Sequence, residues 1–544
     1  MGRQKVQGAT AGTQQMHFEP YRDGEAKPFW ERPSVIVALI LLSALPLFWP
    51  DVPPLVDMPG HMGRYRVQLD LATSPALQQF YTFDWRLIGN LGVDLLVELL
   101  GPLLGLELAV KLIVVTVPAL TVAGMLWVAH EVHGRIPPTT LFALPFAYNF
   151  PFVFGFVNFA LAVGLVFLAF ALWLRLARKD KLALRAILFV PISVLLWVVH
   201  AFGWGMLGLL AFSAELVRQY DHRRAGFSPR WSGCVPAFVT AGVHAGIQCL
   251  SLVPPVALML LWRSEAAGRT TDWFNWERKW EWVTQALRDR WELFDYASMG
   301  LVAFLILAAF AVPKVTYSRN LLASTLFLIA VFILLPRVVF GSAYADMRLA
   351  PYLFAIALVA IRFPPDVSRR LVMIVGVAGL AFFLIRTAAT TTSMWRYDQA
   401  YDRELAALDH VPHGAAMVSF VGRPCTEPWA MSRLLHLPAM AMVRREAFSN
   451  DQWTMAGAQL LQVKYQPGWP FIRDASQVVT LRRCRNEVWR TIDTALATFP
   501  RHGFDYVWLI DPPPYDPALT RGLRPIWRDG TSVLYRVEQP RFWP

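Results

Sequence analysis

The chain has 544 residues, of which 55% are hydrophobic and 17% are charged, and its mean hydropathy is +0.39. Soluble domains usually carry about 25% charged residues, so this composition excludes an ordinary soluble protein. The net charge of +12 does not indicate nucleic-acid binding, because Lys and Arg occur in short scattered clusters rather than on one face.

Apolar residues form blocks of about 20 residues, the length that a membrane-spanning helix needs. The sequence predicts an α-helical polytopic membrane protein with about 11 spans. The predicted spans cover residues 34–50, 107–128, 139–154, 156–175, 183–200, 202–217, 235–262, 298–312, 320–336, 349–361 and 371–388. No small-residue cleavage site follows the first block, so we expect a retained span rather than a signal peptide. Pro151 and Gly155 interrupt the chain between the third and fourth blocks, which could also form one broken helix.

Basic residues give an independent test of this topology. With the N-terminus inside, every short cytoplasmic loop carries at least one Lys or Arg. These residues are Arg135; Arg175, Arg178, Lys179, Lys181 and Arg185; Arg218, Arg223, Arg224 and Arg230; Lys314 and Arg319; Arg362, Arg369 and Arg370. The short external turns at 151–156 and 200–202 carry none, so the pattern supports an odd number of spans.

This topology divides the chain into three parts. We expect a cytoplasmic N-terminal tail over residues 1–33, a transmembrane module over 34–389, and an external domain over 390–544. The module has two long external loops, at 51–106 and 263–297. The second loop predicts an amphipathic helix at the membrane surface, because indole rings occur there among charges. Its indoles are Trp273, Trp276, Trp280, Trp282 and Trp291.

The tail from 390 to 544 has the pattern of a small α/β domain. Short strand-like runs occur at 416–421, 506–510 and 532–537, and a helical stretch at 487–497. Asp529 and Gly530 predict a turn before the last strand. Cys425 and Cys484 both fall in this tail and predict a disulfide in an oxidising compartment, although two free thiols remain the alternative. The cysteine spacing predicts no metal site, and we expect no cofactor.

The start of the first external loop holds the strongest candidate site. Pro59 predicts a helix start, after which His61 and Arg64 lie on the same face with Asp57 just ahead of them. A carboxylate, an imidazole and a guanidinium placed together could deprotonate a hydroxyl and hold a phosphate. The alternative is that Asp57 caps the helix and Arg64 contacts lipid headgroups.

Further candidates map to the same side of the membrane. Tyr344, Asp346 and Arg348 follow the ninth span, where Asp346 and Arg348 could also simply pair with each other. Asn158 and His200 lie at span ends, where helix packing is the alternative role.

Four short motifs, together with this topology, give the chain a resemblance to a known superfamily. They are LVDMPGH at 55–61, GFVNF at 155–159, HAFG at 200–203 and ADMR at 345–348. The chain resembles the GT-C superfamily of integral-membrane glycosyltransferases. Within that superfamily it is similar to the bacterial branch related to protein O-mannosyltransferases and to the lipid A aminoarabinose transferase. The resemblance implies a GT-C-like module in the bacterial inner (plasma) membrane with its C-terminal domain in the periplasm.

The resemblance also implies an inverting sugar transfer from a polyprenyl-phosphate donor to an acceptor hydroxyl on a lipid, glycan or protein. Asp57 would be the general base, while His61, Arg64 and Arg348 would hold the donor phosphate. Many relatives carry two acidic residues close together in this loop, so Asp51 is the alternative base. A transporter or flippase of a lipid-linked sugar is the alternative function, and a non-catalytic partner in envelope assembly is another.

Overall fold

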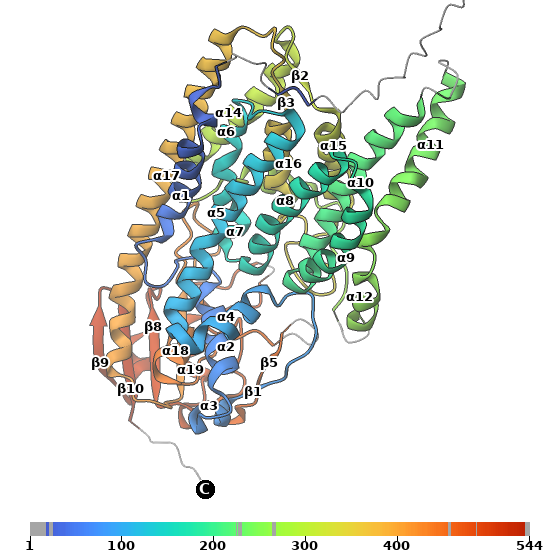
Figure 1. The fold of residues 1–544 in the computed structure, drawn as a ribbon. Coiled ribbons are helices and arrows are strands. Elements are labelled where there is room, and N and C mark those ends of the chain that lie inside the picture. The colour runs from blue at the N-terminus through green and yellow to red at the C-terminus, as the bar shows by residue number, and fades with distance from the viewer. Residues whose placement is uncertain are drawn as a thin grey trace, which may run out of the picture.

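The computed structural model describes residues 18–20, 26–224, 226, 231–263, 268–454, 459–485 and 487–538. Most of the predicted N-terminal tail, and Arg230, therefore lie outside the described residues. A bundle of long helices occupies one end of the molecule, and a domain that contains a β-sheet occupies the other (Figure 1).

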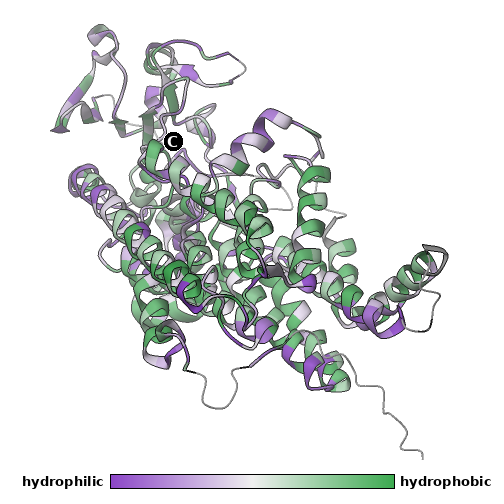
Figure 2. Ribbon diagram, turned by 90° about the horizontal axis from the view of Figure 1, so that it is seen from above, coloured by the Kyte–Doolittle hydropathy of each residue, from purple (hydrophilic) through white to green (hydrophobic). Residues whose placement is uncertain are grey.

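Five described helical segments are long and apolar enough to cross a membrane, which indicates a membrane protein. They are α5 (Leu106–His133), α8 (Val157–Arg178), α9 (Leu182–Val199), α14 (Glu292–Ala311) and α17 (Arg369–Leu405). Hydrophobic residues run along the long helices, whereas hydrophilic residues gather in the connections and near the C-terminus (Figure 2).

The remaining predicted spans are also helical, but they are shorter, bent or more polar. α11 (Trp231–Gln248) and α12 (Pro255–Arg263) make one pair bent by 46°. α10 (Ala201–Arg224) ends in a charged last turn. The shorter apolar segments are α1 (Pro33–Ala44) with its 3₁₀ extension, α6 (Thr140–Ala143) through α7 (Phe150–Phe154), α15 (Arg319–Leu334) and α16 (Ala350–Ala360). The number of eleven spans thus stays a prediction.

The helical conformation is interrupted between α7 and α8, so these segments are two helices and not one. α7 ends at Phe154, Gly155 adopts a left-handed backbone with φ of 110°, and α8 begins at Val157. Glycine meets this conformation without the steric cost that a Cβ atom would add.

The loop predicted to be the first external one, residues 51–106, folds into a short helical layer between the bundle and the C-terminal end of the molecule (Figure 1). It contains α2 (Met58–Asp70), α3 (Pro75–Phe80), β1 (Tyr81–Phe83) and α4 (Gly92–Leu104). Pro59 occupies the first turn of α2, as predicted. In the second loop, α13 (Trp276–Thr284) is the predicted amphipathic helix: Trp276 and Trp280 are exposed, whereas Trp282 and Lys279 are buried.

The C-terminal domain is built on a six-stranded mixed sheet in the order β7-β6-β4-β8-β10-β9. The first four strands of that order run parallel, and β8, β10 and β9 pair antiparallel. The strands are β4 (Met417–Gly422), β6 (Val478–Thr480), β7 (Arg490–Thr491), β8 (Tyr506–Ile510), β9 (Leu523–Asp529) and β10 (Ser532–Val537). The three predicted strands and the turn at Asp529 and Gly530 are confirmed. The predicted helix begins later, as α19 (Ile492–Thr498), because Thr491 caps its first turn.

The loop at 51–106 and the C-terminal domain form one packed unit. β1 pairs antiparallel with β5 (Leu461–Val463), and Phe80 and Tyr81 pack on Phe448 in a shared hydrophobic core. α18 (Met440–Arg445) also packs on α2. The boundary predicted at 389/390 falls inside α17, which runs on to Leu405 beside the sheet (Figure 1). The cavity that Asp57 lines lies at this junction.

Candidate functional site

A cavity of about 1000 Å³ lies where the helices meet the C-terminal domain. One apolar part of its lining comes from α10, α12 and α15 and includes Met206, Leu209, Met259, Leu328 and Val331. Its charged lining comes from the segments before α2 and α16 and from the C-terminal domain, and includes Asp57, Arg348, His436 and Asp474. The cavity therefore joins a hydrocarbon-like surface to a cluster of ionisable groups.

Asp57 is held at the start of α2 by its backbone. Its amide nitrogen donates to the Phe154 carbonyl oxygen at 3.0 Å, and its carbonyl oxygen accepts from His61. Its side chain makes no capping hydrogen bond, so the capping role considered above is absent. The carboxylate instead faces the cavity and is 14% exposed. Burial raises the pKa of Asp57 to about 7; His436 and Arg348 oppose this shift, and Asp474 adds to it.

Asp51, the alternative base, lies in a different environment. Its side chain is 84% exposed and its nearest described cation is Lys111, at 3.7 Å. It does not line the cavity. The structure thus brings Asp57, and not Asp51, into the enclosed site.

His61 lines the cavity but does not carry the positive charge that its predicted role requires. Its ring packs against Tyr65 and Trp453, and its Nδ1 atom has no hydrogen-bond partner among the described residues. Burial, Arg64 and His436 lower the pKa of His61 well below its usual value, so the imidazole is neutral at pH 7. A neutral ring can donate a hydrogen bond to a phosphate but adds no charge.

Arg64 does not line the cavity, so the structure does not bring it together with Asp57 and Arg348 as predicted. The side chain is buried and pairs with Asp94 of α4 at 2.9 Å. It is also 3.4 Å from Gln459 Oε1. The helical spacing placed Arg64 beside His61 on α2, but the packing of α4 against α2 supplies a buried carboxylate that fixes the guanidinium elsewhere.

Arg348 and Tyr344 line the cavity, whereas Asp346 does not. Asp346 pairs with Lys279 of α13 at 3.1 Å, and not with Arg348 as the alternative expected. Arg348 lies 4.2 Å from the Phe156 ring centroid and donates to the Ala343 carbonyl oxygen. Its Nε atom has no partner among the described residues. Burial lowers the pKa of Arg348 to about 10, and the side chain remains a cation at pH 7.

Asn158 and His200 line the cavity with side chains that already have hydrogen bonds. Asn158 accepts from the Val93 amide and donates to the Asn90 carbonyl and to Asp94. His200 Nδ1 accepts from the Phe202 amide at 3.1 Å. Both therefore serve to fix helix ends, as the packing alternative predicts, and they shape the cavity wall.

The C-terminal domain contributes groups that sequence patterns did not indicate. His436 Nε2 lies 3.9 Å from Asp57 Oδ1, and His436 Nδ1 lies 3.6 Å from Asp451 Oδ2. The Trp453 ring packs on His436 with centroids 4.4 Å apart. Asp451 and Trp453 belong to the run at 449–453, which is polar except for Trp453. This polar composition is the one feature of the sequence that could have indicated a site there.

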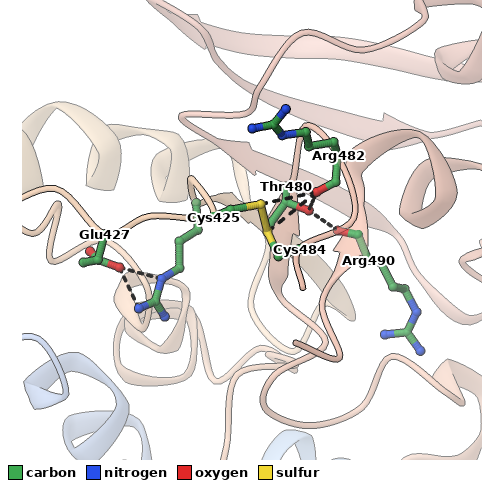
Figure 3. Close-up of a disulfide and its surroundings, with 7 residues drawn as sticks. Cys425, Glu427, Thr480, Arg482, Cys484 and Arg490 are labelled. Atoms are coloured by element: carbon green, nitrogen blue, oxygen red, sulfur yellow. Dashed lines mark hydrogen bonds and ion pairs between the residues drawn. A yellow bond between two sulfur atoms is a disulfide. The ribbon is translucent and has the colours of Figure 1, made fainter. Parts of the chain in front are cut away.

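Cys425 and Cys484 form the predicted disulfide, with Cα atoms 5.4 Å apart (Figure 3). The bond ties the segment after β4 to the loop between β6 and β7. The neighbouring Arg423 and Glu427 pair at 2.6 Å and both line the cavity. The disulfide therefore fixes one edge of the site. Cys249 is a free thiol.

Among the described residues, no group of three or more His, Cys, Asp or Glu side chains could hold a metal ion. No protein-family model matches the chain, and no curated protein shows significant sequence similarity to it.

Proposed function

We propose that this chain is a GT-C-type membrane glycosyltransferase that moves a sugar from a polyprenyl-phosphate donor to an acceptor hydroxyl. The proposal rests on one observation: Asp57 and Arg348 face a cavity whose other wall is apolar and comes from helices of the bundle. A soluble sugar nucleotide has no long apolar group, so contact with that wall would add no binding free energy.

The apolar wall suits a polyprenyl chain. Each methylene group removed from water contributes about 0.8 kcal/mol, so a lipid-linked donor stays in hydrocarbon until its head group reaches a polar site. Met206 and Leu209 of α10 and Leu328 and Val331 of α15 offer such a surface beside the charged cluster.

Asp57 suits the role of general base. In the reaction, the acceptor oxygen attacks the anomeric carbon from the face opposite the phosphate, and its proton passes to the Asp57 carboxylate. The bond between the anomeric carbon and the phosphate oxygen breaks, and polyprenyl phosphate leaves with the electron pair. A base with a pKa of about 7 is matched to reaction near neutral pH.

Arg348 suits the role of the cation at the leaving phosphate. It is 7% exposed, lines the same cavity and keeps one guanidinium nitrogen without a hydrogen-bond partner among the described residues. In a site that excludes water, such a donor stabilises developing negative charge strongly. Tyr344 and the neutral His61 line the cavity as further hydrogen-bond donors.

The same proposal sets the cavity at the periplasmic face of a bacterial inner membrane. The basic connections expected in the cytoplasm include Lys314 and Arg319, which flank β2 (Thr316–Tyr317), and Arg362, which ends β3 (Ile361–Arg362). These strands lie at the end of the bundle opposite the C-terminal domain (Figure 1). A green fluorescent protein fused after residue 544 should therefore stay dark, whereas alkaline phosphatase fused there should be active.

The central experiment compares Asp57→Asn with Asp51→Asn in proteoliposomes. Undecaprenyl phosphates carrying one radiolabelled sugar at a time are supplied with an extracted cell-envelope acceptor fraction. Asp57→Asn should lower transfer by about 10²- to 10⁴-fold, and Asp51→Asn should leave it unchanged. Equal transfer by Asp57→Asn would reject Asp57 as the base. Donor movement across the bilayer without any product would instead support the transporter.

A further inference from the structure

His436 is the C-terminal domain group that lies nearest to the proposed base. It is 3% exposed, lines the cavity and lies with its ring between two carboxylates. Asp57 Oδ1 is 3.9 Å from Nε2 on one side, and Asp451 Oδ2 is 3.6 Å from Nδ1 on the other. An imidazole placed between two acidic groups favours its protonated form.

Asp451 is itself fixed in place beside the His436 ring. Asp451 is fully buried and accepts a hydrogen bond from Ser449 Oγ at 2.8 Å. The Ser449 amide in turn donates to the Tyr81 hydroxyl, which belongs to β1 of the first external loop. The carboxylate that orients His436 is therefore tied to the same loop that carries Asp57.

The C-terminal domain packs closely against α2. A methyl group on Gly60 of α2 would come within 2.7 Å of the Trp453 side chain and 3.3 Å of His436 Cβ. Gln452 Nε2 donates to the Gly60 carbonyl oxygen at 3.2 Å. The C-terminal domain is thus in direct contact with α2, and the distance from His436 to Asp57 is set by packing.

We propose that His436, oriented by Asp451, is a positioning residue through which the C-terminal domain supplies the positive charge that favours ionisation of Asp57. The role rests on the proposed function of Asp57 as a base and deepens it. The C-terminal domain is then part of the reacting unit and not only a platform for the acceptor.

The balance of charge around the pair supports this role. The ionisable groups that face it come from four parts of the chain. They are Asp57 and His61 at the start of α2, Asp451 and Asp474 from the C-terminal domain, Tyr344 and Arg348 from the segment before α16, and Tyr401 of α17. Burial lowers the pKa of His436, but Asp451, Asp474 and Asp57 outweigh this and raise it to about 9. At pH 7 the imidazolium is therefore present beside a carboxyl group that burial alone would keep neutral.

The test follows protonation of Asp57 directly. Dicyclohexylcarbodiimide is an apolar reagent that modifies protonated carboxyl groups, and mass spectrometry reports labelling of Asp57 in the full-length protein against pH. The wild-type midpoint should lie at about 7. In His436→Gln it should rise by about one to three pH units, because an opposite charge within about 4–6 Å shifts a carboxyl by that amount.

Three further variants complete the design. Asp451→Asn should raise the midpoint in the same direction by a smaller amount, and His436→Lys, which keeps the charge, should stay nearest to wild type. His502→Gln changes an exposed histidine of the same domain and should have no effect. Thermal unfolding in detergent identifies folded variants, and Asp451→Asn provides the decisive comparison if His436→Gln does not fold.

An unchanged labelling midpoint in folded His436→Gln or Asp451→Asn would overturn the inference. The labelling does not depend on turnover. A wild-type protein that transfers no sugar, yet shows the expected shifts, would reject the proposed function and leave the link between His436 and Asp57 intact.

Discussion

Gly155 lies directly against Asp57. A methyl group built on Gly155 would come within 2.7 Å of the Asp57 amide nitrogen and 2.8 Å of its Cβ atom. The glycine occupies the break between α7 and α8, and the neighbouring Phe154 carbonyl accepts the Asp57 amide. The proposed base is therefore positioned by backbone contacts with the segment that connects α7 to α8.

Gly155→Ala should move Asp57 and strain the break. The left-handed backbone at φ of 110° costs a non-glycine residue about 1–3 kcal/mol, which should lower the unfolding temperature. A displacement near 1 Å should reduce sugar transfer by about 10²-fold. Gly208→Ala is the matched control, because a methyl group there meets no atom within 4 Å. Equal transfer by the two variants would contradict this account.

The rate of transfer should depend on the ionisation of Asp57. Burial raises the pKa of this carboxyl group to about 7, so the base is protonated and inactive at pH 5 and ionised above pH 8. Initial rates should rise about tenfold per pH unit below the midpoint and then level off. Asp51→Asn should show the same curve, since Asp51 is exposed and outside the cavity. A flat profile between pH 5 and 8 would exclude Asp57 as the base.

Arg64→Gln and Arg348→Gln should have different effects. Arg64→Gln leaves the buried Asp94 carboxylate unpaired, which should reduce the free energy of unfolding by about 3–5 kcal/mol. Arg348→Gln should instead raise the KM for the lipid donor by about 10- to 100-fold, the loss of one hydrogen bond to a charged group, with a smaller effect on stability. Unfolding in detergent and donor titration separate the two. The reverse pattern would place the donor phosphate at Arg64.

Removal of the disulfide should destabilise the edge of the cavity. Cys425 and Cys484 are separated by 59 residues, and replacement of both by Ser should lower stability by about 2–4 kcal/mol. A reducing agent should lower the unfolding temperature of the wild type and of Cys249→Ser, but not that of the double variant. An equal response in the double variant would show that the reductant acts elsewhere.

Several elements could be predicted because a local pattern determines them. The strand β8 at Tyr506–Ile510 and the turn at Asp529 and Gly530 follow from residue propensity and backbone preference, and the structure confirms both. The predicted helix at 487–497 was less accurate, because the Thr491 cap sets where α19 begins. The length of α17 was also not predicted, because the apolar block ends near residue 388 whereas the helix continues to Leu405.

The sequence by itself determined the apolar helices, the start of the helix that follows Asp57 and the strands of the tail, because hydropathy and turn chemistry act over short distances. Tertiary structure alone decided which charged side chains meet. It paired Arg64 with Asp94 and Lys279 with Asp346, and it brought His436 to Asp57 across 379 residues of chain. A buried charge takes whichever partner the packing supplies, since an unpaired one is too costly to keep, and no local spacing encodes that partner.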